Sequence, residues 1–158
     1  MQPYAVFITA LVPALLFVIG CSGDPPLHPI SGKVTLGGQP HERLLVYFRP
    51  INEPVTQFNL GVGETDKDGN LKLRSSGGMG LEAGQYRVTF SCFVVGNSAL
   101  GVDQKVDELS PGSEDAESKQ MVPKPYLEQE GTETSPVEFT IKPGQNVFEF
   151  DIPLTPAG

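Results

Sequence analysis

Three oxygen-bearing side chains stand at alternate positions of the stretch TDKDGNLKL (residues 65–73): Asp66, Asp68 and Asn70. Calcium-binding loops place oxygen ligands at positions 1, 3 and 5 in this way, but they also need a glycine at position 6 and a bidentate Glu at position 12. Here position 6 is a leucine and position 12 is a glycine. Gly69 instead suits a hairpin tip, where aspartates bond nearby amides and glycine takes a positive φ. We predict a turn, with a weak calcium site as the alternative.

The other side chains suited to catalysis are few. The two histidines, His28 and His41, have no partner at a metal-ligand spacing, and no His-Glu-x-x-His, His-x-x-Glu or Gly-x-Ser-x-Gly pattern is present. His28 falls in a Pro-rich segment and His41 in a turn, so both are expected to be exposed loop residues. The sequence therefore predicts neither an enzyme nor a bound cofactor.

The N-terminal segment is apolar and free of charged side chains up to Gly20, and Pro13 interrupts it. Its apolar part is shorter than the roughly 20 residues that a membrane-spanning helix needs. It ends in VIGCSG, which closely resembles the lipobox of bacterial lipoproteins. The resemblance implies a signal peptide over residues 1–20, diacylglycerol on the thiol of Cys21, and a lipidated tether over residues 21–29; the alternative is an uncleaved anchor or a misassigned start codon. It places the protein in the bacterial cell envelope, outside the cytoplasm, with membrane lipid as one partner and the covalent lipid on Cys21 in place of any cofactor.

Acidic residues dominate the charge. The chain carries a formal net charge of -8, and an acidic body is a poor ligand for phosphate backbones, so we predict no nucleic-acid partner. Residues 97–131 hold eight acidic residues and three lysines, with little apolar alternation. Connections of that length are either functional or mobile. The alternatives are a solvated loop and a contact surface for a basic partner or a loose cation; the candidate residues are Asp107, Glu108, Glu114, Asp115 and Glu117.

Alternating apolar residues predict about seven strands, in segments 30–36, 43–50, 60–65, 70–74, 84–93, 136–142 and 146–152. Gly- and Pro-rich turns separate them, which is typical of an all-β chain. We therefore expect a single antiparallel β-sandwich over residues 30–155, with the long acidic insertion at 97–131. Cys92 is in phase with Tyr86, Val88 and Phe90, so it is predicted to be a buried, inert thiol.

The order of these motifs resembles the carboxypeptidase regulatory-like and transthyretin-like domains. SGKVTLGGQP, LLVYFRP, GETDKDGNLKL and LEAGQYRVTF follow one another as in those domains, and VPKPYLEQEGTETSPVEFTIKPGQNVFEFDI is similar to the ending of small lipoproteins that carry them, including a closing hairpin. The resemblance implies a prealbumin-like sandwich in which Gly84 and Tyr86 are scaffold residues.

A fold does not specify a function, since function depends on sites placed on it. We predict a membrane-anchored secreted lipoprotein that acts as a non-enzymatic interaction or envelope-structural module, with an unknown envelope protein or glycan as partner. A glycan- or peptide-binding module is the alternative, and a hydrolase of the transthyretin-like class comes third. Hydroxyisourate hydrolases end in Tyr-Arg-Gly-Ser, whereas this chain ends in LTPAG. Tyr47 is out of phase with its apolar neighbours, so it marks an interface or packs under the long loop.

Overall fold

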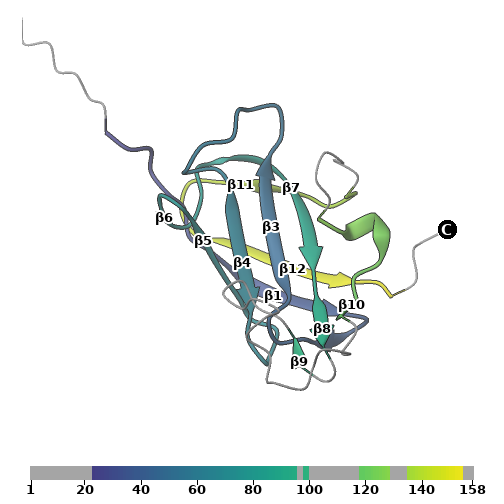
Figure 1. Cartoon of the computed structure of the whole chain (residues 1–158). Coiled ribbons are helices and arrows are strands. Elements are labelled where there is room, and N and C mark those ends of the chain that lie inside the picture. The colour runs from purple at the N-terminus through teal and green to yellow at the C-terminus, as the bar shows by residue number, and fades with distance from the viewer. Residues whose placement is uncertain (1–22, 96–97, 100–117, 129–134, 155–158) are drawn as a thin grey trace, which may run out of the picture.

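The computed structural model describes residues 23–95, 98–99, 118–128 and 135–154, and the regular secondary structure among them is β-strand apart from one short 3₁₀ turn (Figure 1). All seven predicted strands are present, and the structure also contains several short strands that were not predicted. In chain order the elements are β1 (Ile30–Leu36), β2 (Gln39–Pro40), β3 (Leu45–Pro50), β4 (Gly61–Thr65), β5 (Leu71–Ser75), β6 (Gly78–Met79), β7 (Gly84–Ser91), β8 (Phe93–Val95), β9 (Ser98–Ala99), β10 (Ser118–Gln120), the 3₁₀ turn η2 (Lys124–Tyr126), β11 (Glu138–Ile141) and β12 (Asn146–Ile152).

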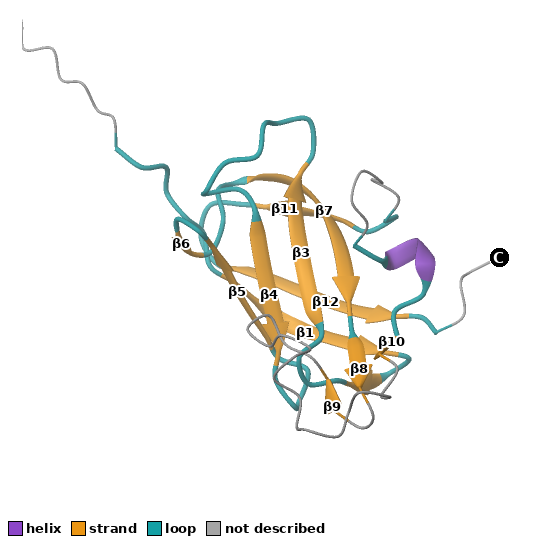
Figure 2. Ribbon diagram, viewed as in Figure 1, coloured by secondary structure: helices purple, strands orange, loops and turns teal. Residues whose placement is uncertain are grey.

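Two sheets face each other in a sandwich-like arrangement (Figure 2). The larger sheet has the strand order β11-β7-β3-β4-β5-β6, the second has the order β12-β1-β2, and a small third sheet has the order β10-β8-β9. The all-β prediction is confirmed. The antiparallel prediction is wrong for one pair among the described strands, because β1 and β12 pair in parallel.

The predicted closing hairpin does not form, although its turn does. β11 pairs with β7 in the larger sheet, whereas β12 pairs with β1 in the second sheet. The buried side chain of Asn146 closes the turn: it accepts from the Lys142 N–H at 2.9 Å and donates to the Lys142 carbonyl at 2.9 Å. The turn therefore passes from one layer to the other, and both strands present an apolar face to the same core.

The core comes from the alternate residues of both sheets. Val46, Phe48, Val88 and Phe90 of the larger sheet are fully buried, and the Phe48 ring meets Phe148 of the second sheet edge-on at 5.2 Å between centroids. Such alternation buries one face of β1, β3, β4, β5 and β12, as predicted, whereas residues 88–91 of β7 are buried on both faces. The core residues are Ile30, Val34, Leu36, Leu44, Val46, Phe48, Leu71, Leu73, Leu81, Tyr86, Val88, Phe90, Cys92, Val122, Tyr126, Val137, Ile141, Phe148 and Ile152.

Tyr86 has the scaffold role expected of it. Its ring is buried, and its hydroxyl donates to the Glu82 carbonyl at 2.9 Å. Burial, with smaller contributions from the carboxylates of Glu82 and Glu53, raises the pKa of Tyr86 to about 12. The hydroxyl is thus held in its neutral, donating form.

The prediction of one long acidic loop is wrong for the described parts of the insertion, residues 98–99 and 118–128, because these parts include the short strands β9 and β10. β10 pairs with β8, the Met121 N–H donates to the Cys92 carbonyl at 2.9 Å, and the Glu128 N–H donates to the Phe90 carbonyl at 3.0 Å. The last of these bonds covers the edge of β7 beyond Arg87, where its pairing with β11 stops, and the others cover Cys92 and β8. An uncovered edge would offer its backbone to other chains, so this segment protects the sheet.

Candidate functional site

The Asp-rich stretch forms the predicted turn. Oδ1 of Asp66 accepts from the backbone N–H groups of Asp68 and Asn70, each at 2.9 Å, and Gly69 has a φ of +81°. The Asn70 amide also donates to both oxygens of Asp66. These hydrogen bonds lower the pKa of Asp66, and the bond from the Asn70 side chain contributes most. The carboxylate therefore builds the turn with both oxygens.

The turn also joins the two sheets. The Val34 N–H of β1 donates to the Gly69 carbonyl at 2.9 Å, and Lys33 forms an isolated bridge with Asn70. A Cβ on Gly69 would lie 2.8 Å from the Val34 carbonyl oxygen. Within the described residues, no group of three or more His, Cys, Asp or Glu side chains could hold a metal ion.

Several predicted site residues lie outside the described residues. These are the lipidation candidate and the acidic surface candidates: Cys21, Asp107, Glu108, Glu114, Asp115 and Glu117. Their assignments stay predictions. Cys92 is described, and it is 1% exposed, so the prediction of a buried thiol is confirmed. Burial raises the pKa of the Cys92 thiol, which disfavours the reactive thiolate.

His28 differs from its predicted role as an exposed residue of a free tether. Its backbone pairs with Leu81, with bonds of 2.7 and 3.2 Å, and its Nδ1 accepts from the Gly144 N–H at 3.1 Å. The predicted tether therefore contacts the body before Pro29. His41 is half-buried, and its carbonyl accepts from the Thr65 hydroxyl at 2.6 Å. Neither contact was visible in the sequence, because the partners are distant along the chain.

Tyr47 is half-buried on the outer face of β3, between Val62 of β4 and Thr89 of β7. Glu128 lies close by: its carboxylate accepts from the Arg49 guanidinium and from the Thr89 hydroxyl. Burial contributes most to a raised pKa of Tyr47, and the negative charge of Glu128 raises this pKa further. The positive charge of Arg49 acts in the opposite direction and lowers it. The covering segment at Glu128 favours packing over an open interface at this tyrosine.

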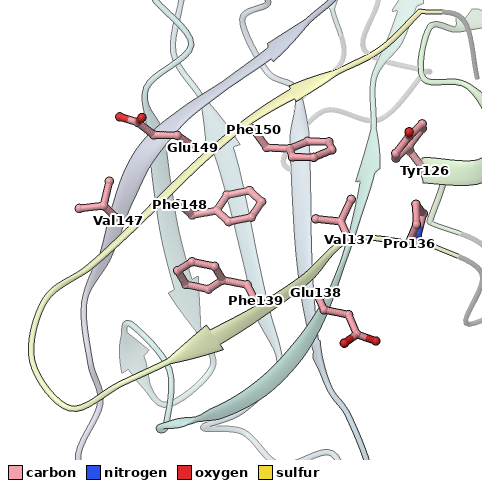
Figure 3. A pocket seen from close by; sticks show the side chains of 9 residues that line it. All are labelled: Tyr126, Pro136, Val137, Glu138, Phe139, Val147, Phe148, Glu149 and Phe150. Carbon is pink, nitrogen blue, oxygen red and sulfur yellow. The ribbon is translucent and has the colours of Figure 1, made fainter. Parts of the chain in front are cut away.

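The sequence did not predict an open groove of about 610 Å³ that lies between β11 and β12. Figure 3 shows Phe139 of β11 and the rings of Phe148 and Phe150 of β12 directed into the space between the two strands, with Tyr126 and Pro136 at one end. Phe139 meets Phe148 edge-on at 5.2 Å, and Phe150 stacks on Phe90 at 5.4 Å. Phe139 and Phe150 remain partly exposed.

The rim of this groove is acidic. Glu138 lies on the β11 side, where Oε1 accepts from Nη2 of Arg87 at 3.0 Å. Glu149 lies on the β12 side and points away from the rings, as Val147 does (Figure 3). Asp151 continues that row and accepts from the Thr35 hydroxyl at 2.6 Å. Aromatic side chains with carboxylates beside them can hold an apolar ligand that also carries positive charge.

Comparison of the chain with protein-family models, curated proteins and solved structures gave no match. Among the residues that the structure describes, no helix is long and apolar enough to cross a membrane. The candidate site is therefore inferred from the arrangement of the described residues alone.

Proposed function

We propose that this chain is a lipoprotein of the bacterial cell envelope, held at a membrane by lipid on Cys21. Its β-body acts as a non-enzymatic interaction module. The lipobox-like sequence VIGCSG supports the anchor. The groove between β11 and β12 carries the interaction role, because it combines partly exposed aromatic rings with two sheet edges that no described strand covers.

We also propose a transthyretin-like fold for the body. The order of the sequence motifs supports it, as does the contact of Tyr86 with the backbone at Glu82. A hydrolase of that class is the least supported function for this chain. Incubating the purified protein with hydroxyisourate tests this view: the expected result is the uncatalysed rate, and clear turnover would overturn the non-enzymatic role.

The groove favours a peptide over a glycan as ligand. Sugars stack on the open face of an aromatic ring, whereas Phe148 is only 4% exposed and is flanked by Phe139 at an interplanar angle of 81°. Flexible chain segments, in contrast, use both side-chain pockets and backbone bonds.

In-cell photo-crosslinking tests the interaction role. A photoreactive residue replaces Val147, which is 61% exposed beside the groove, or Val55, which is 55% exposed in the connection between β3 and β4. The matched exposure makes Val55 a control for random collisions. We expect a discrete envelope adduct from position 147 alone. Equal, diffuse labelling from both positions would contradict a binding role for the groove.

A further inference from the structure

We propose that the free edge of β12 binds an extended peptide segment in which apolar and basic residues alternate. The inference deepens the interaction role proposed above, and it does not depend on the lipid anchor. It assigns the ligand class, the strand that receives it, and the residue that selects its charge.

The backbone of β12 is arranged for strand addition. The Asn146 N–H donates to the Pro29 carbonyl at 3.0 Å, and the Ile152 carbonyl accepts from the Gly37 N–H at 2.8 Å, so the even-numbered residues of β12 face β1. Backbone groups alternate along a paired strand. Those of Val147, Glu149 and Asp151 therefore point to the opposite edge, where no described strand pairs with β12. An added strand would find three outward N–H and three outward C=O groups there.

The side chains on the two faces of this edge differ. On the inner face, Phe148 and Phe150 extend toward Phe139 across the groove (Figure 3). On the outer face, β12 presents Val147, Glu149 and Asp151, which alternate with the rings. Side chains of an added strand alternate in the same way. Apolar residues would therefore enter the groove, and the residues between them would lie beside the outer carboxylates.

Charge selects a basic ligand on the outer face. Glu149 is exposed, and its cross-strand neighbour on β1 is Lys33, so its other side is open to a second cation from an added strand. Opposite charges on adjacent strands stabilise the pair, and like charges destabilise it. The net charge of -8 would also attract a basic segment.

The same charges disfavour a second copy of this chain. A two-fold pairing centred on β12 would place Glu149 directly opposite Glu149 of the other copy, which is unfavourable. Charged residues on an edge strand are a common defence against self-association. A foreign basic segment avoids this repulsion, so it is the favoured occupant.

The test uses the full chain in detergent micelles at physiological salt, with two capped heptapeptides as probes. KVKVKVK has the proposed alternation, and KKVVVKK has the same composition and charge without it. Amide hydrogen exchange at Val147, Glu149 and Asp151 is followed by NMR. We expect KVKVKVK to slow exchange at these amides about tenfold, whereas KKVVVKK leaves them nearly unchanged.

A pair of charge reversals tests the selectivity. Glu149→Lys should weaken KVKVKVK binding about tenfold, whereas Glu53→Lys, an equal charge change in an exposed loop away from the groove, should change it little. Equal protection by both peptides would overturn the inference, as would protection of β11 amides only. Protection that rises with protein concentration in the absence of peptide would assign the edge to a second copy. A captured envelope partner without heptapeptide binding would leave the interaction role standing and reject the peptide class.

Discussion

Asp66 uses its carboxylate for structure. Its oxygens accept from the amides of Asp68 and Asn70, and the turn they form places Gly69 against β1. The hydrogen bonds from Asn70, the largest contribution to the shift, hold the pKa of Asp66 below its ordinary value of 3.8. This outcome was readable from the sequence, since Asp, Gly and Asn at these spacings are typical of a local turn.

Removing this carboxylate should destabilise the protein in a pH-dependent way. Because the folded state lowers the pKa of Asp66, the stabilisation is fully present above pH 3.8 and is lost as the pH falls through the lower folded value. We expect Asp66→Ala to lower the thermal midpoint at pH 7 more than Asp68→Ala does. The difference in thermal midpoint between Asp66→Ala and wild type should become smaller below pH 3.8. Thermal unfolding followed by circular dichroism measures both, and a gap that widens on acidification would refute the role.

Strand faces were predictable, but strand partners were not. Alternation in segments 136–142 and 146–152 shows which residues face the core, and this was right for Phe148 and Ile141. It does not state which sheet a strand joins. The family resemblance implied a closing hairpin here, whereas the two strands lie in opposite layers. The groove was missed for the same reason, because it exists only where these two edges stay open.

Gly32 allows the parallel pairing of β1 with β12. Its φ is +152°, and a Cβ there would lie 1.8 Å from the backbone oxygen of Phe148. We expect Gly32→Ala to cost about 3 kcal/mol or more in the free energy of unfolding, because backbone atoms must move.

The matched control for this change is Gly38→Ala. Gly38 also has a positive φ, +76°, but a Cβ there would meet no atom within 4 Å. Its replacement should cost only about 1 kcal/mol, the backbone strain alone. Urea unfolding followed by circular dichroism compares the two variants. If both variants lose the same free energy of unfolding, the close approach of β1 and β12 at Gly32 is not what makes an alanine there destabilising.

Residues 118–128 of the acidic insertion show that a segment without apolar alternation can still pair with a sheet. Residues 118–128 have little alternation, yet they cover the edge of β7 through backbone bonds and through the Gln120 side chain, which accepts from the Cys92 N–H at 2.9 Å. Backbone bonding of this kind leaves no periodic signal in the sequence. Val122 and Tyr126 of this segment are buried in the core, and Met121 and Leu127 pack against it.

At the scale of the whole molecule, the proposed anchor and the body are close along the chain. Five residues lie between Cys21 and Leu27, which lies next to His28 at the start of the contacts with the body. An extended chain of that length spans at most about 20 Å. A lipid on Cys21 would therefore keep the body near the membrane surface, within reach of envelope partners.

The two cysteines provide a matched test of the anchor. Cys21→Ser should abolish labelling by a radioactive fatty acid and move the protein to the soluble fraction, or leave an uncut precursor, because the lipid is attached through the thiol. Cys92→Ala removes the buried thiol and should leave labelling and membrane fractionation unchanged. Continued lipid labelling of Cys21→Ser would exclude this anchor.

The proposed function of the protein is to bind a partner along the open edge beside the aromatic groove. Its most direct test is the yield of in-cell crosslinks from position 147 in three backgrounds: unchanged, Glu149→Lys and Glu53→Lys. We expect one reproducible partner, a crosslink yield reduced about tenfold by Glu149→Lys, and little change in yield with Glu53→Lys. Equal yields in all three backgrounds, or no adduct above the Val55 control, would contradict it.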